Sequence, residues 1–172
     1  MANLYIYFTA ENHWYSRLLR WAEGGSVSHV GFAFDLNPFG ELWILEAEKR
    51  GVLLLPAKIY LSKKKVTRKF KCTYDALKGI KALGSHVGEW YDYKGAFLMG
   101  LWYLIKKFFR KLRRPYYQTE WQKCSELFYD FVKADGLKLR EFESDPEWIS
   151  PNTVLRICKS NSEKFEEIEE II

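Results

Sequence analysis

The sequence predicts an α+β domain with an antiparallel sheet early in the chain and helices after it. Short alternating segments predominate up to residue 72, helical spacing of apolar residues predominates after it, and turn-forming residues separate the early segments. Of the 172 residues, 48% are hydrophobic, which is enough for one domain with a sizeable core. Without repeats, low-complexity tracts or Pro/Gly/Ser linkers, residues 1–172 are expected to form a single domain.

The early part of the chain holds the expected strands. They are Leu4–Phe8, Ser28–Phe34, Leu42–Ala47, Gly51–Leu55 and Val66–Cys72. Between the first two, Asn12–Glu23 has helical spacing, and Gly24-Gly25 ends this helix as a C-terminal cap does. Residues 35–40 have turn composition, so the second and third strands are expected to pair as an antiparallel hairpin.

Helices are expected after residue 72. Three are predicted, at Asp75–Val87, Ala96–Phe109 and Glu120–Ala134. Ser150-Pro151 begins a further turn or short helix, with Ser as N-cap and Pro at the first helical position.

Residues 97–114 form an apolar and basic helical insertion. Its apolar part ends at Ile105 and is shorter than the roughly 20 residues that cross a bilayer. We expect a core helix. The alternative is a helix lying on an anionic membrane, because the basic cluster Lys106–Arg114 follows directly.

The cysteines, the N-terminal segment and the net charge indicate the cellular compartment and the kinds of partner to expect. Cys72, Cys124 and Cys158 cannot all pair and show no zinc-site spacing, which favours a reducing compartment. The segment Met1–Phe8 lacks the basic region and cleavage site of a signal peptide, so a cytoplasmic protein is expected, with peripheral membrane or virion association as a further option. The net charge is +5, but no fold signature of nucleic-acid binding accompanies it.

Cys124 is a candidate nucleophile. Helical spacing places it on the inward side with Phe128 and Phe131 near a helix start, where backbone N–H groups favour a thiolate. Two alternatives weaken this hypothesis. A capping box at Thr119–Gln122 would place Cys124 one turn inside the helix, and a buried cysteine often packs simply as a small hydrophobe.

His29, which opens a strand, is the candidate base for this thiol, and a strand histidine bonded to backbone is the alternative. Glu46 and Glu48 share a face of the neighbouring strand, so either carboxylate would orient the imidazole. Glu46 is preferred because it interrupts the apolar run Leu42–Leu45, where a carboxylate is unexpected.

Several short motifs follow one another in a defined order. They are Ser28–Gly31, Ile44–Ala47, Gly51-Val52, Tyr91–Tyr93, Cys124–Leu127 and Ser150-Pro151. This order, with His before Cys, resembles the permuted branch of the NlpC-type papain-like hydrolases. The YiiX-like proteins are the nearest group, and the lecithin–retinol acyltransferase-like proteins are more distant.

The resemblance implies a circularly permuted papain-like fold, with a small antiparallel sheet packed on the Cys-bearing helix. It also implies that Cys124 is the nucleophile, His29 the base and Glu46 the orienting carboxylate. Besides the backbone N–H of Cys124, either Gln122 or Tyr7 is considered as an oxyanion donor.

The expected activity is that of a thiol hydrolase, which cleaves an amide bond in a peptide or a peptidoglycan-like substrate through an acyl-enzyme. A lipid acyltransferase or thioesterase of the same fold is the enzymatic alternative. A non-catalytic basic module that binds membranes through Lys106–Arg114 is the non-enzymatic one. The hydrolase requires no metal or organic cofactor.

Overall fold

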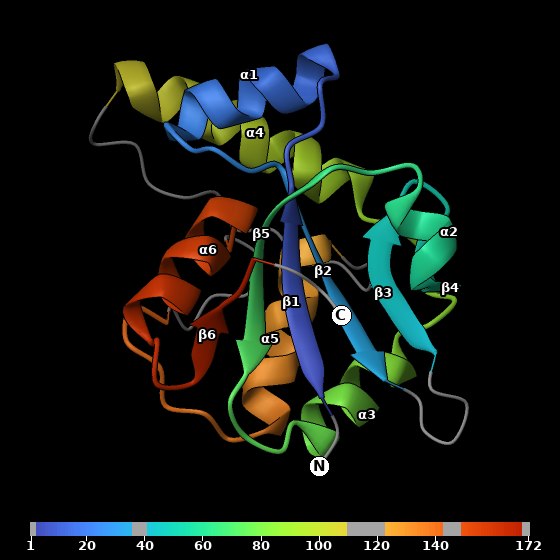
Figure 1. Cartoon of the computed structure of the whole chain (residues 1–172). Coiled ribbons are helices and arrows are strands. Elements are labelled where there is room, and N and C mark those ends of the chain that lie inside the picture. Colours follow the sequence, from blue (N-terminus) through green and yellow to red (C-terminus); the bar gives the residue numbers. More distant parts are fainter. Residues whose placement is uncertain (1–2, 36–40, 110–122, 143–148, 170–172) are drawn as a thin grey trace.

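The computed structural model describes residues 3–35, 41–109, 123–142 and 149–169, and Figure 1 shows their arrangement. Six strands form one antiparallel sheet in the order β4-β3-β2-β1-β5-β6. The strands are β1 Leu4–Thr9, β2 His29–Asp35, β3 Leu42–Glu48, β4 Gly51–Pro56, β5 Val66–Cys72 and β6 Phe165–Glu167. The helices are α1 Trp14–Glu23, α2 Ala57–Leu61, α3 Leu77–Ser85, α4 Tyr93–Phe108, α5 Cys124–Ala134 and α6 Pro151–Ser160. The predicted α+β class is confirmed.

The five predicted strands and the early helix are confirmed, and two predicted caps are present. Gly24 ends α1 in the left-handed conformation, at φ 68°. Ser150 begins α6, where its hydroxyl accepts a hydrogen bond of 3.2 Å from the Thr153 N–H. The sequence did not predict α2 and β6, because five and three residues are too few for a periodic pattern.

Both faces of the sheet are covered at its centre, and β1 is buried along its whole length. Leu4, Ile6 and Phe8 point into the main core, where α5 and α6 pack on the sheet. The alternate residues Tyr5 and Tyr7 join a smaller cluster on the opposite face, next to α2. In Figure 1 α5 runs behind the strands, while α2 lies beside β3.

The expected hairpin of β2 and β3 is confirmed, and its register determines which residues are neighbours. Phe32 is paired with Leu45, so one further step places Gly31 opposite Glu46 and makes Glu46 a diagonal neighbour of His29. Tyr7 of β1 pairs with Gly31 on the other side. A Cβ on Gly31 would lie 2.1 Å from the Tyr7 hydroxyl oxygen, so glycine is required for the Tyr7 ring to cross β2.

Helix α4 lies against α1 rather than against the sheet (Figure 1). It begins three residues before the expected start because the Asp92 carboxylate caps it, accepting a hydrogen bond of 2.8 Å from the Gly95 N–H. Trp102 is buried, but Phe97, Leu101 and Phe108 are 59%, 42% and 74% exposed. The expectation of a core helix is therefore wrong for this side of α4. Residues 110–114 of the expected insertion lie outside the described residues.

Helix α5 begins at Cys124, later than the expected start near Glu120. Lys123 is extended, with φ −98° and ψ 155°, so Cys124 is the first helical residue and not one turn inside the helix. The Lys123 N–H donates to the Glu126 carboxylate at 2.8 Å, and the Lys123 ammonium lies 2.7 Å from the same carboxylate. The capping box proposed for Thr119–Gln122 lies outside the described residues.

Lys123 is 2% exposed and lies between two buried carboxylates, Glu126 and Asp92, the latter at 3.7 Å. Replacing Lys123 with Ala should lower the free energy of unfolding by about 3–5 kcal/mol, because it leaves buried charges without their cation. Urea denaturation of the full chain measures this change. Lys159→Ala on the exposed side of α6 is the control and should shift the free energy of unfolding by less than about 0.5 kcal/mol. Equal effects of the two substitutions would contradict a stabilising role for Lys123.

Candidate active site

A buried carboxylate on β3 anchors the candidate site. Glu46 is fully buried, and its Oε2 lies 2.8 Å from His29 Nε2. The Tyr7 hydroxyl donates a second hydrogen bond, of 3.2 Å, to the same oxygen. The structure therefore brings together the predicted pair His29 and Glu46 and adds a partner that the sequence analysis assigned elsewhere.

Cys124 lies next to His29. Both residues line one pocket, and the two side chains interact closely enough for Cys124 to affect the pKa of His29. Because Nε2 is bonded to Glu46, Nδ1 is the ring nitrogen left for another partner. The three predicted site residues thus lie together, Cys124 on α5, His29 on β2 and Glu46 on β3, although 95 positions separate His29 from Cys124 in the sequence.

The charges around His29 favour its protonated form. Burial by itself lowers the pKa of the imidazole, but negative charge on Cys124 and the Glu46 carboxylate outweigh burial and raise the pKa of His29 to about 10. Burial likewise acts to raise the pKa of Glu46, yet the hydrogen bond and charge of His29 lower it overall. Burial first and then Glu46 raise the pKa of Tyr7, so Tyr7 stays a neutral donor.

Glu48, the alternative to Glu46, has a different partner. Its carboxylate lies 2.5 Å from the Lys64 ammonium, which also contacts Glu11. The backbone N–H of Glu11 in turn donates to the Ser28 hydroxyl at 3.1 Å. This ion pair borders the site but leaves the contact with His29 to Glu46.

A pocket of about 880 Å³ leads to the thiol. His29, Cys124 and Lys123 line it from the side of the sheet, and residues of α1, α4 and the segment before α4 also line it. The whole lining includes charged residues, among them Glu11, Glu48, Arg50 and Lys64, and apolar or aromatic ones, namely Trp14, Leu19, Val27, Tyr91, Tyr93, Ala96, Phe97 and Met99. The arrangement suits a substrate whose reacting group meets polar side chains while the rest of it contacts apolar ones.

The backbone N–H of Cys124, which the sequence analysis named as an oxyanion donor, lies at the N-terminus of α5. Cys124 is the first helical residue, and the first N–H groups of a helix have no partner within it. As the second donor, Tyr7 is wrong: it is fully buried and its hydroxyl is bonded to Glu46. Gln122 lies outside the described residues.

The sequence analysis missed the hydrogen bond from Tyr7 to Glu46 and the buried position of Lys123. One signal for Tyr7 was present, since a tyrosine in a fully apolar strand requires a partner for its hydroxyl. No comparable signal existed for Lys123, because lysines are rarely buried.

Comparisons with known proteins place the fold. No family model matches the sequence, and no curated protein matches it either. Among solved structures, the metalloprotein YiiX from Escherichia coli O157:H7 is similar with a TM-score of 0.60 and 14% sequence identity. The likeness covers 97% of this chain and 96% of that chain.

YiiX is called a metalloprotein. Within the described ranges of this chain, no group of three or more His, Cys, Asp or Glu side chains is arranged to hold a metal ion. At 14% identity the similarity concerns architecture. The chain therefore shares the fold of YiiX, in agreement with the resemblance to YiiX-like proteins.

Proposed function

We propose that this protein is a thiol hydrolase of the circularly permuted papain-like type, with Cys124 as nucleophile, His29 as base and Glu46 as orienting carboxylate. One observation carries the proposal. His29 lines the same pocket as Cys124 and is hydrogen-bonded to the buried Glu46, and Cys124 occupies the first position of a helix. This is the nucleophile–base–orienter arrangement of covalent acyl transfer.

In the proposed reaction Cys124 Sγ attacks the carbonyl carbon of the substrate, and the carbonyl oxygen becomes an oxyanion near the Cys124 N–H. Collapse of this intermediate breaks the bond to the leaving group, which takes the proton from His29. An acyl-enzyme remains. Water or another acceptor then attacks it while His29 accepts the proton of the attacking group, and the thiolate is released.

Glu46 and Tyr7 act through His29. The Glu46 carboxylate fixes the Nε2–H tautomer and stabilises the imidazolium. Tyr7 donates to the same carboxylate oxygen and limits its movement. Both are buried, so this positioning does not depend on solvent.

The resemblance implies an amide substrate, of peptide or peptidoglycan-like type. A lipid ester or thioester is the second candidate, since apolar residues such as Leu19, Val27 and Met99 line part of the approach to the thiol, beside charged ones such as Arg50 and Lys64. The two candidates share the acyl-enzyme step and differ in the group that fills the pocket.

An activated ester tests the acyl-enzyme directly. Incubation of the full chain with a p-nitrophenyl ester should release nitrophenolate and add one acyl group to the peptide that contains Cys124. Cys124→Ala should lower the rate by at least about 10²-fold, and the buried Cys72→Ala variant should keep it. Mass spectrometry locates the adduct. Acylation elsewhere, or full activity in Cys124→Ala, would refute the proposal.

The three thiols should differ in reactivity towards iodoacetamide. Burial raises the pKa of Cys72 to about 12 and also raises that of Cys158, so both should react slowly in the folded protein. Cys124 lines the pocket beside His29 and should be alkylated first. His29→Ala should slow alkylation of Cys124 at mildly acidic pH by about tenfold or more. Peptide mapping over time gives the three rates, and equal rates would contradict the assignment.

The pH dependence of hydrolysis of an alkyl ester, whose leaving alkoxide takes a proton from His29, should identify the orienting carboxylate. With the pKa of His29 raised to about 10, kcat/KM should fall only as pH rises through that value and His29 loses its proton. Glu46→Gln removes a charge that favours protonated His29, so the alkaline limb should move down by about one to three pH units. Glu48→Gln is the matched control on the same strand and should leave the limb unmoved. The opposite pattern would transfer the role to Glu48.

A further inference from the structure

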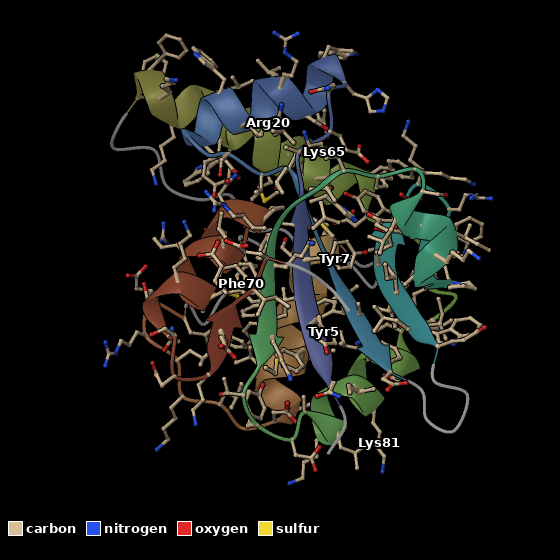
Figure 2. All side chains as sticks on the ribbon, in the orientation of Figure 1. Tyr5, Tyr7, Arg20, Lys65, Phe70 and Lys81 are labelled. Atoms are coloured by element: carbon tan, nitrogen blue, oxygen red, sulfur yellow. The ribbon has the colours of Figure 1, made fainter. Side chains whose placement is uncertain are left out.

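Exposed apolar side chains are concentrated on the two helices that border the pocket. Thirteen large hydrophobic side chains are exposed among the described residues; seven of them lie in α1 or α4, and Phe109 follows α4 directly. Six of them make up what we call the α1–α4 face: Trp14, Trp21, Phe97, Leu101, Ile105 and Phe108. In Figure 2 side chains of this region, aromatic rings among them, stand out from the end of the molecule farthest from the N-terminus.

The face is continuous across both helices. Phe97, Leu101 and Ile105 are spaced by four residues and share one side of α4, and Trp14 and Trp21 are spaced by seven on α1. An apolar groove of about 330 Å³ separates the helices, and α1 and α4 alone line it. A contiguous apolar surface of this kind marks an interaction site more often than scattered exposed residues do.

The charges around the face are cationic. Helix α4 contains no Asp or Glu and ends with Lys106 and Lys107, and the sequence continues with the basic residues of the Lys106–Arg114 cluster. Helix α1 contains Arg17, Arg20 and a single carboxylate, and Arg20 donates to the Glu11 carbonyl at 2.7 Å and is not counted with the face. That carboxylate, on Glu23, accepts a hydrogen bond from Asn152 of α6 and is not part of the face.

Two lysines are held close to indole rings at the outer end of α4. The Lys107 ammonium lies 3.6 Å from the centroid of the Trp21 ring and donates to the Trp21 carbonyl at 3.0 Å. The Lys106 ammonium lies 4.4 Å from the centroid of the Trp102 ring. The exposed Trp21 ring beside Lys107 suits the boundary between lipid headgroups and acyl chains, where the ring contacts apolar groups and the ammonium meets phosphate, whereas Trp102 is buried.

We infer that the α1–α4 face docks on an anionic lipid bilayer. None of the described helices is long and apolar enough to cross a membrane. Docking therefore means that α1 and α4 lie along the surface, apolar side chains down and lysines at the phosphates. The pocket and the groove share Trp14, Leu19 and Phe97, so the docked protein presents the entrance of the thiol pocket to the lipid.

Vesicle sedimentation with the full chain tests the inference. The protein should bind vesicles of phosphatidylcholine with phosphatidylserine at least about tenfold more tightly than vesicles of phosphatidylcholine alone, and added salt should weaken the binding. The double substitution Leu101→Glu with Phe108→Glu should reduce binding by about tenfold or more. Ile59→Glu with Leu77→Glu adds the same charge at exposed apolar positions on α2 and α3, and should bind as the unchanged protein does.

All four positions are at least 42% exposed, and thermal unfolding followed by circular dichroism confirms that both variants fold. Absence of binding to anionic vesicles, or equal loss in both variants, overturns the inference. So does a dimer of the free chain that dissociates in the Leu101/Phe108 variant, because a second copy would then cover the face. Cys124→Ala should bind vesicles normally, which separates failure of docking from failure of the proposed hydrolase.

Discussion

The site depends on one buried carboxylate. Glu46 is fully removed from water, and a buried charge is costly unless it is paired and hydrogen-bonded. His29 and Tyr7 both bond to its Oε2, and their strands must keep an exact register for them to do so. A slip of one residue in β3 would turn Glu46 to the opposite face of the sheet. Position 31 on β2 must be glycine for the same reason: the Tyr7 ring reaches Glu46 through the space that a side chain at this position would occupy.

The thiol side of the site uses a second buried charge pair. Lys123 and Glu126 fix the first turn of α5, and Asp92 joins them to the start of α4. Burial is the main reason that the pKa of Glu126 rises to about 7; Lys123 acts against that rise and Asp92 adds to it. The residues that begin both helices are therefore coupled, and Cys124 follows them directly. Cys124 is thus placed by electrostatics at its helix start as well as by packing.

The sequence was most informative where one periodicity was enough. The hairpin of β2 and β3 followed from alternation around a turn, and Glu46 stood out because it interrupts an apolar run. The start of α5 was misplaced because it depends on Lys123 and on a partner 31 positions earlier, Asp92, which no local pattern reveals. The side chains of α4 were misassigned for a related reason: apolar spacing specifies that a helix has an apolar face but not what will cover it.

The layer formed by α1 and α4 is not explained by folding alone. These helices contact each other at one end of the sheet, and Trp102 and Met99 already supply the buried side of α4. Phe97 and Phe108 remain more than half exposed, so burial at these positions contributes only part of its possible stabilisation. A polar side chain at Phe108 would cost the fold little, whereas an apolar one carries a risk of aggregation. The inferred docking would account for the composition of this face, and the pocket that Cys124 lines shares residues with it.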